Sequence, residues 1–352
     1  MALIAVAADK GSPGATTTAV ALAALWPRRA LLAEVDPAGG DLVYRSARED
    51  GRPLDPGTGL LSLAATARRG IAAEQLWDHS QRVSGGLDLI VGLTSSDQGT
   101  GVSGQYGALG KAFAELARSP HEEAAADVVA DCGRLGPDSP ALALLPHAAV
   151  VLLVTRTQPE NLAHTRERAL ALSAKLHGQH RGAAQHGRPP IGLLLVTEPS
   201  QGGRIASQVN EMLTAAGSGA RVAGLLAEDA AGADQLAGRR RGRVDKSLLV
   251  RSVRKVVSDL HQTYRELAPA VTGAVGTLPP QPPAGAAPPS HGRAPVPPQY
   301  GAQGPRTPAP VPPGGPWPPP TAPPASGGYG YPAPGNGYGY PAPGHGPHGG
   351  HR

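Results

Sequence analysis

A short glycine-containing segment near the amino terminus has the residue types needed to hold a phosphate group. It reads Asp9-Lys10-Gly11-Ser12-Pro13-Gly14-Ala15-Thr16-Thr17-Thr18, and it lies between an apolar run and a helical pattern. Glycines let backbone N–H groups approach an anion closely, and the positive end of a helix dipole favours negative charge there. The segment therefore predicts a phosphate-binding loop. The alternative is a tight turn over 11–14, followed by a helix that Thr16 or Thr17 caps.

Apolar runs that could form buried strands recur along the chain and alternate with amphipathic segments. The predicted strands are 2–8, 31–35, 87–91, 127–130, 149–154, 191–196 and 222–226. The predicted helices are 16–26, 60–69, 108–117, 160–176, 204–215 and 247–267. Strands that are apolar throughout and alternate with helices indicate an α/β fold, a mostly parallel sheet with helices on both faces. Ligands of such sheets bind beyond the carboxyl ends of the strands, where the segment 9–18 falls.

The segment 9–18 resembles the deviant Walker A loop of the MinD/ParA group of P-loop ATPases, which reads K-G-G-x-G-K-[ST]-T. Lys10 falls on the signature lysine of that group, and Thr16 falls on its magnesium-binding hydroxyl. The resemblance implies that residues 11–17 bind ATP with Mg²⁺. It also implies a homodimer, because the signature lysine of the family reaches the phosphates of the partner subunit's nucleotide.

Two later segments are similar to further motifs of the same family. Residues 31–41 resemble its D-x-D-P switch segment, with Glu34 in place of the first acid and Asp36 on the residue that orients the attacking water. Residues 127–133 are similar to the Walker B strand, where Asp131 would hold Mg²⁺ through water. The family usually has proline soon after this aspartate, whereas Gly133 intervenes here. An acid at a strand end often only caps a loop, but the order and spacing of these segments together favour the family. The resemblance covers roughly residues 1–267.

Ala15 departs from the family pattern at the position of the phosphate-binding lysine. A charge-assisted hydrogen bond of this kind contributes about 1.5 to 3 kcal/mol, or about ten- to a hundredfold in affinity. The departure predicts weakened or absent hydrolysis and leaves both nucleotide binding and enzymatic activity open.

A dense basic stretch lies near the end of the predicted domain. Its members are Arg239, Arg240, Arg241, Arg243, Lys246, Arg251, Arg254 and Lys255, and Asp245 is the one acid among them. Such a density could attract DNA without sequence preference, or anionic lipid. The alternative is a solvated loop and helix face.

The last part of the chain has a different composition. Of the 76 residues in 277–352, 41 are proline or glycine, and the repeat GYGYPAPG occurs at 328–335 and again at 337–344. Such a segment cannot bury enough apolar surface to offset the entropy of ordering it. We therefore predict a P-loop domain over 1–268 and a disordered Pro/Gly/Tyr-rich tail over 269–352. The tail could bind a protein partner or serve only as a solubilising linker.

The cysteine content, the amino-terminal residues and the longest apolar run indicate the cellular compartment in which the protein acts. The single cysteine, Cys132, excludes an intramolecular disulfide and fits a reducing compartment, and no basic leader precedes the first apolar run. The longest apolar run, 141–155, is interrupted by Pro146 and is too short to span a bilayer. We expect a cytoplasmic protein that associates with the nucleoid or a membrane through partners.

The resemblance implies one of two functions. The first is a nucleotide-dependent switch in chromosome or plasmid partitioning, or in positioning of cellular machinery, with weakened or absent ATP hydrolysis. The second is a catalytically dead pseudo-ATPase scaffold, like the CpaE branch, that localises a pilus or secretion apparatus. Lys10, Asp36 and Asp131 favour the first, and Ala15 favours the second.

Overall fold

The computed structural model describes residues 2–178, 189–237, 239 and 244–267. These belong to the first of the two units into which the chain divides, Met1–Val275. The predicted tail over 269–352 lies outside the described residues, as do Arg240, Arg241 and Arg243.

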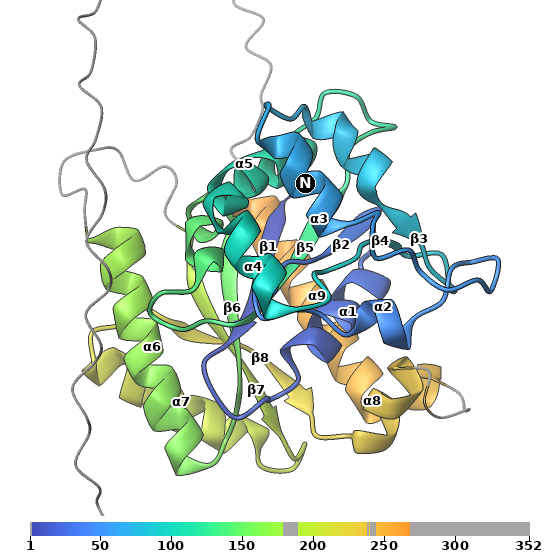
Figure 1. Cartoon of the computed structure of the whole chain (residues 1–352). Helices are drawn as coiled ribbons and strands as arrows, with labels where there is room; N and C mark the ends of the chain where they lie inside the picture. The colour runs from blue at the N-terminus through green and yellow to red at the C-terminus, as the bar shows by residue number, and fades with distance from the viewer. Residues whose placement is uncertain (1, 179–188, 238, 240–243, 268–352) are drawn as a thin grey trace, which may run out of the picture. The chain divides into compact units, whose positions relative to one another are not determined.

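The described chain forms an eight-stranded sheet with the order β3-β4-β2-β5-β1-β6-β7-β8. Every neighbouring pair is parallel except β3 and β4, which are antiparallel. The strands are β1 (Leu3–Ala8), β2 (Ala30–Glu34), β3 (Gln81–Arg82), β4 (Asp88–Ile90), β5 (Asp127–Arg134), β6 (Val150–Arg156), β7 (Ile191–Thr197) and β8 (Arg221–Ala227). The predicted α/β fold with a mostly parallel sheet is confirmed (Figure 1).

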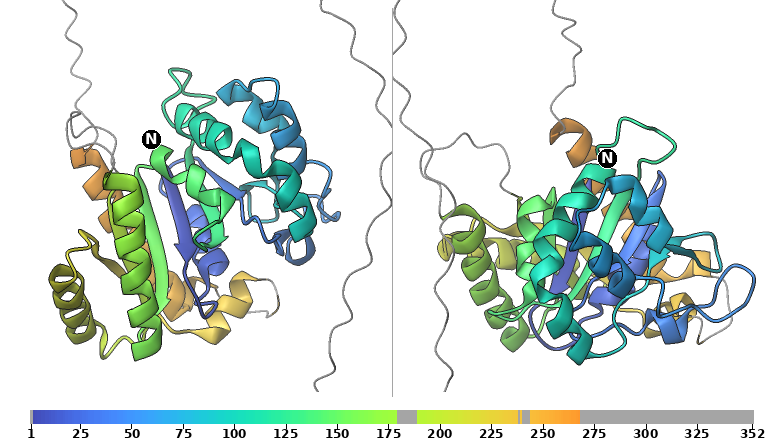
Figure 2. Two further views of the ribbon diagram at one scale, coloured as in Figure 1. Left: turned by 60° about the vertical axis from the view of Figure 1, so that its left-hand side comes forward. Right: turned by 45° about the horizontal axis from the view of Figure 1, so that its top comes forward.

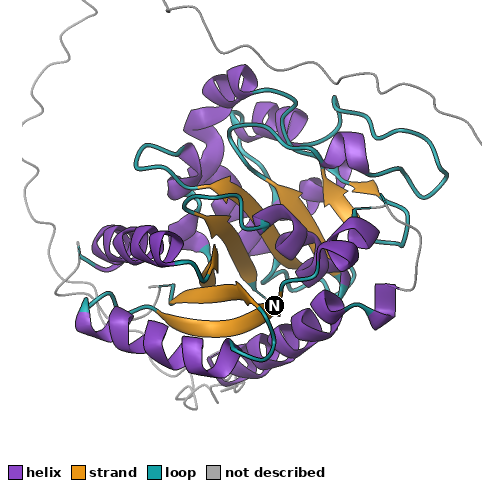
Figure 3. Ribbon diagram, turned by 90° about the horizontal axis from the view of Figure 1, so that it is seen from below, coloured by secondary structure: helices purple, strands orange, loops and turns teal. Residues whose placement is uncertain are grey.

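Helices cover both faces of this sheet (Figure 3). The α-helices are α1 (Ala15–Ala24), α2 (Leu42–Arg45), α3 (Leu60–Ala67), α4 (Ser96–Val102), α5 (Tyr106–Leu116), α6 (Pro159–His177), α7 (Gly202–Ala215), α8 (Ala230–Leu236) and α9 (Leu248–Leu267). Short 3-10 helices span Ala73–His79, Ser103–Gln105, Pro140–Ala143, Leu145–His147 and Val244–Lys246. No helix in the described ranges is long and apolar enough to cross a membrane.

Two apolar clusters, one on each face of the sheet, form the core. One face packs against side chains of α3, α5, α6 and α7. The other packs against α1 and α9. All residues of β1 are buried, because both faces of this central strand are covered, and this explains why the predicted strands show apolar runs rather than alternation. The two views of Figure 2 show the green helix α6 on one side of the sheet and the orange helix α9 on the other.

The amino-terminal end of β5 is held by a buried carboxylate. Asp127 accepts hydrogen bonds from the Ala2 N–H, from Trp26 Nε1 at 2.8 Å and from Arg28 Nε at 2.9 Å. Its side chain is fully buried, whereas the Arg28 side chain is 36% exposed. A buried charge with this number of donors is well compensated, so Asp127 fixes the first strand, the first helix and β5 relative to one another.

Candidate phosphate-binding site

The loop between β1 and α1 has an unusual backbone conformation. Gly11, Ser12 and Gly14 have positive φ angles of 78°, 45° and 93°, and Ser12 is the one non-glycine residue with positive φ in the described ranges. Gly14, the residue just before α1, has a left-handed conformation. Glycine is favoured there, because a residue with a β-carbon would be strained in that conformation. Backbone strain in a non-glycine residue is typical of ligand-binding loops.

The first turn of α1 offers free amide donors. Gly14 precedes the helix without any side-chain cap, so neither Thr16 nor Thr17 caps it, contrary to the alternative raised above. The first amide with a helical partner is that of Thr18, which donates to the Gly14 carbonyl at 2.9 Å. The amides at 14–17 have no acceptor among the described residues. These donors and the helix dipole together form an anion-binding arrangement.

Ala15 contributes no charge to this arrangement. It is 8% exposed, and it belongs to the apolar cluster formed by α1 and α9. The position that carries the phosphate-binding lysine in the resembling family is therefore part of the core here.

Helix α6 holds the loop from the side. Arg168 Nε donates to Asp9 Oδ1 at 2.6 Å, and both side chains are largely buried. The carboxamide of Asn161 lies against Gly11, where a β-carbon would come within 2.7 Å of its Oδ1. Sequence reasoning missed both residues, because α6 is distant from the loop along the chain and no motif marks it.

Asp131 lies fully buried in β5, opposite the start of α1. Its Oδ1 accepts the Gly133 N–H at 3.1 Å, while its Oδ2 is buried without a hydrogen-bond partner in the described part of the chain. Burial raises the pKa of Asp131 to about 6, the Thr16 hydroxyl and the Gly133 N–H lower it, and the nearby Asp36 raises it further. The Thr16 hydroxyl thus stabilises the ionised carboxylate without reaching Oδ2 at a regular hydrogen-bonding distance.

Asp36 approaches the same place from the end of β2. Its carboxylate packs so closely against Gly133 that a β-carbon at residue 133 would overlap it, and Gly133 has a φ of 59°. Asp36 Oδ1 accepts the Ala38 N–H at 2.8 Å. The pKa of Asp36 is raised, mainly by burial, whereas the Ala38 N–H and the Arg134 guanidinium lower it. The structure therefore brings Thr16, Asp36 and Asp131 together.

Glu34 has a structural role beside this cluster. Its carboxylate accepts the N–H of Leu42 at 3.1 Å and the N–H of Gly92 at 2.9 Å, so it ties the start of α2 to the end of β4. Burial raises the pKa of Glu34 to about 7, against the effect of both amides and with a contribution from Asp131. Arg45, whose Nε is buried without a partner in the described ranges, lowers the pKa of both Glu34 and Asp131.

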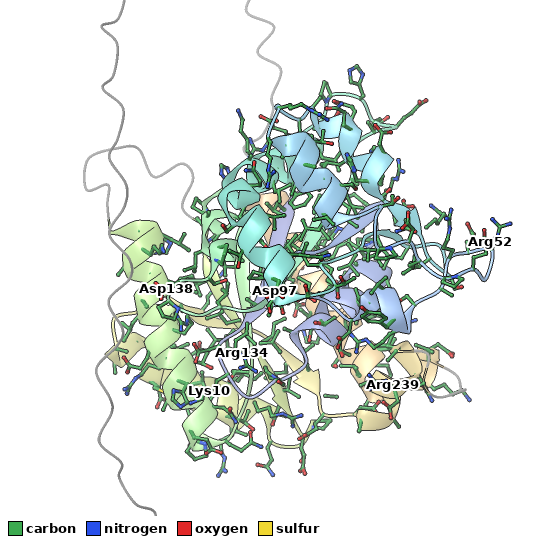
Figure 4. All side chains as sticks on the ribbon, in the orientation of Figure 1. Lys10, Arg52, Asp97, Arg134, Asp138 and Arg239 are labelled. Atoms are coloured by element: carbon green, nitrogen blue, oxygen red, sulfur yellow. The ribbon has the colours of Figure 1, made fainter. Side chains whose placement is uncertain are left out.

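Lys10, in the loop, and Arg134, at the end of β5, are exposed cations, and both are labelled in Figure 4. Sequence reasoning identified Lys10 but missed Arg134. The available signal was the position of Arg134, directly after Gly133 at the end of the Walker B-like strand.

The donor set suits Mg²⁺ only in the presence of phosphate oxygens. No group of three or more His, Cys, Asp or Glu side chains that could hold a metal ion occurs among the described residues. Thr16 and Asp131 alone supply one hydroxyl and one carboxylate, and the unpartnered Asp131 Oδ2 is available to a water of a bound ion. Mg²⁺ is commonly bound in this way, with few protein ligands, several waters and substrate phosphates.

The described members of the predicted basic stretch lie elsewhere in the molecule. Arg251 and Arg254 are exposed on α9, on the side opposite its buried residues. Those buried residues are Leu249, Val250, Val253, Val256, Val257 and Leu260. Arg239, which follows α8 (Figure 4), is exposed and lies 3.8 Å from the carboxylate of Asp234.

Burial raises the pKa of the Cys132 thiol well above its usual range. A thiol that is buried in this way stays protonated and is not activated as a nucleophile.

Several solved structures superpose on this chain over most of their length. A ParA family ATPase from Chlorobium tepidum superposes with a TM-score of 0.54 at 16% identity, covering 74% of this chain and 98% of that chain. A putative plasmid partition protein from Borrelia burgdorferi bound to AMPPNP gives 0.51 at 12% identity, covering 74% and 99%. The septum site-determining protein MinD from Pyrococcus horikoshii, complexed with Mg-ADP, gives 0.50 at 15% identity, covering 75% and 97%.

No protein-family model and no curated protein matches the sequence. At these identities the structural similarity establishes the fold. This chain has the MinD/ParA-like P-loop fold.

Proposed function

We propose that this protein is a nucleotide-responsive switch that acts in chromosome or plasmid partitioning or in the positioning of cellular machinery, with weakened or absent ATP hydrolysis. The observation that carries the proposal is the convergence of Thr16, Asp36 and Asp131 on a loop with unpaired amides. Two solved structures with the same fold are described as complexes with Mg-ADP and with AMPPNP, and this supports ATP and Mg²⁺ as the ligands.

The chain's own residues define the roles in this proposal. The amides at 14–17 would bind phosphate oxygens, and Thr16 and Asp131 would hold Mg²⁺, the latter through water. The metal ion, when bound, neutralises charge on the phosphates. Asp36 would accept a hydrogen bond from water and orient it toward the terminal phosphate, because phosphoryl transfer depends on positioning more than on covalent help.

Weak turnover follows from Ala15. Without an ammonium group at this position, the terminal phosphate loses one charge-assisted hydrogen bond, which is worth about 1.5 to 3 kcal/mol in binding and acts again on the charge that develops during transfer. The proposed protein therefore changes state chiefly by binding and releasing nucleotide.

The proposed output requires partners. Lys10 is exposed at the rim of the loop, where it is free to reach the nucleotide of a second copy in a homodimer. The exposed arginines of α9 would bind DNA without sequence preference. The Pro/Gly/Tyr-rich tail over 269–352 would bind a protein partner, and the protein would act in the cytoplasm, at the nucleoid or at a membrane.

A second candidate function is favoured by the burial of Ala15 in the apolar core. In this candidate the chain is a pseudo-ATPase scaffold that localises a pilus or secretion apparatus and no longer turns over nucleotide. The two candidates differ in their dependence on nucleotide, so one measurement separates them.

Isothermal titration of the full-length protein with ATP, in the presence of Mg²⁺, is that measurement. The switch requires binding below millimolar concentration, and the absence of binding at that concentration would exclude it. Ala15→Lys should raise ATP affinity about ten- to a hundredfold and produce measurable phosphate release. If this variant binds ATP more tightly but still releases no phosphate, the catalytic roles of Asp36 and Asp131 are wrong and the scaffold is favoured.

A further inference from the structure

Arg134 lies beside the loop on the strand next to β1. It is the last residue of β5 and pairs with Ala8, the last residue of β1, after an irregularity in the register. The following amide, that of Leu135, donates to the Ala8 carbonyl at 2.8 Å. Neighbouring strands lie about 4.8 Å apart, so the backbone of Arg134 is one strand spacing from the start of the loop.

The guanidinium of Arg134 is electrostatically part of the site. It lowers the pKa of Asp36, the carboxylate that packs against Gly133. Arg134 is exposed, and it makes no ion pair or side-chain hydrogen bond with any described residue. Its positive charge therefore acts on the carboxylate of Asp36 and is not neutralised by a fixed partner among the described residues.

The other arginines near this edge of the sheet already interact with acidic residues. Arg168 is paired with Asp9, and Arg156 is paired with Glu228. Arg45 acts on the buried carboxylates of Glu34 and Asp131. Of these four arginines, Arg134 is the one that is both exposed and without an ion pair or side-chain hydrogen bond to a described residue.

We infer that Arg134 supplies to the terminal phosphates of a bound nucleoside triphosphate the positive charge that Ala15 does not supply. The cation would then reach the phosphates from the end of β5 rather than from the first turn of α1. A guanidinium is suited to this role, because its planar set of N–H donors can form paired hydrogen bonds with phosphate oxygens. The inference rests on the proposed nucleotide-binding function.

The test is isothermal titration of the full-length protein with ATP, ADP and AMP in the presence of Mg²⁺. Arg134→Ala should weaken ATP binding about ten- to a hundredfold and leave AMP binding nearly unchanged, because AMP lacks the terminal phosphates. The matched control is Arg118→Ala. Arg118 is also exposed, but it lies in the segment that leads from α5 to the amino-terminal end of β5, so its removal should change ATP affinity less than twofold.

A charge-relocation variant makes the test specific. Adding Ala15→Lys to Arg134→Ala should restore ATP affinity to within a few-fold of the original, because the ammonium then takes the place of the guanidinium. Wild-type affinity in Arg134→Ala would overturn the inference and leave the proposed function intact. Undetectable ATP binding by the wild-type protein would overturn both. Equal weakening for ATP and AMP would show a structural effect and would also overturn the inference.

Discussion

Two buried carboxylates in the same strand should respond in opposite ways to removal of their charge. Asp127 and Asp131 are both fully buried in β5. Asp127 has donors from the Ala2 amide, Trp26 and Arg28, whereas Asp131 has one amide donor and a buried, unpartnered Oδ2. In the absence of nucleotide and Mg²⁺, we predict that Asp131→Asn stabilises the protein and that Asp127→Asn destabilises it.

The magnitude for Asp131 follows from its pKa. Burial raises this pKa from 3.8 to about 6, and each pKa unit corresponds to about 1.4 kcal/mol, so the ionised form costs roughly 3 kcal/mol in the folded protein. Between these two pH values the folded state keeps a proton that the unfolded chain has released. The wild-type protein therefore loses stability as the pH rises from about 4 to about 6, and this contribution stays constant above that range.

Asparagine at position 131 cannot ionise, and its side-chain oxygen can still accept the Gly133 N–H. The free energy of unfolding of Asp131→Asn should therefore equal that of the wild type near pH 4 and exceed it by about 3 kcal/mol at pH 8. Asp127→Asn weakens hydrogen bonds to a buried ion and should lose about 1 to 3 kcal/mol at pH 8. Urea unfolding in EDTA at several pH values measures both variants.

The reasoning would be refuted if Asp131→Asn were less stable than the wild type at pH 8. It would also be refuted if the difference between the two proteins did not change with pH, because the cost of burying a charge must vanish when the carboxyl is protonated. The same variant should lose the stabilisation that ATP with Mg²⁺ gives the wild type. A gain in stability with a loss of binding is the expected signature of a carboxylate kept for a ligand.

Three further predictions concern the surroundings of the site and the basic helix. Gly133→Ala should lower the free energy of unfolding, measured in urea titrations, by about 1 to 3 kcal/mol, because the new β-carbon would overlap the Asp36 carboxylate and residue 133 has a positive φ. Gly136→Ala is the control, because a β-carbon at that position meets open space and should not change the stability. Glu34→Ala leaves two backbone amides without their acceptor and should cost about 2 to 4 kcal/mol, with faster hydrogen exchange at those amides; unchanged exchange would argue against the bridge. The double variant Arg251→Ala, Arg254→Ala should leave the melting temperature unchanged. It should reduce the slope of log affinity for DNA against log salt concentration by about 0.9 per lost phosphate contact, as measured by fluorescence anisotropy. An unchanged slope would exclude this face of α9 as the DNA-binding surface.

The parallel part of the fold was predictable, because its strands are buried on both faces and therefore appear in the sequence as apolar runs. The observed limits of β1 (Leu3–Ala8) and β7 (Ile191–Thr197) each lie within one residue of the predicted ranges 2–8 and 191–196. The antiparallel strand β3 was not predicted. It has two residues, one buried and one exposed, which is too short for any periodicity to be visible.

The candidate site was predictable where chemistry is local in sequence. Thr16 follows β1 at the start of α1, Asp131 lies in β5, and both belong to segments that the sequence marks by local patterns. Arg134, Arg168 and Asn161 were not predicted, because their roles depend on the register of β5 against β1 and on the packing of α6. Glu34 was identified as a replaced acid, but its two amide partners become visible only in three dimensions.

Helix α6 contacts the loop after β1 and also the segment that precedes β7. Its 19 residues span about 28 Å, with Asn161 in the first turn and Arg168 at the middle of the helix. At the other end, His177 Nε2 lies 3.0 Å from the carbonyl oxygen of Pro189, just before β7. Helix α6 therefore connects the loop, at the carboxyl ends of the strands, with the segment that leads into β7 at their amino-terminal ends.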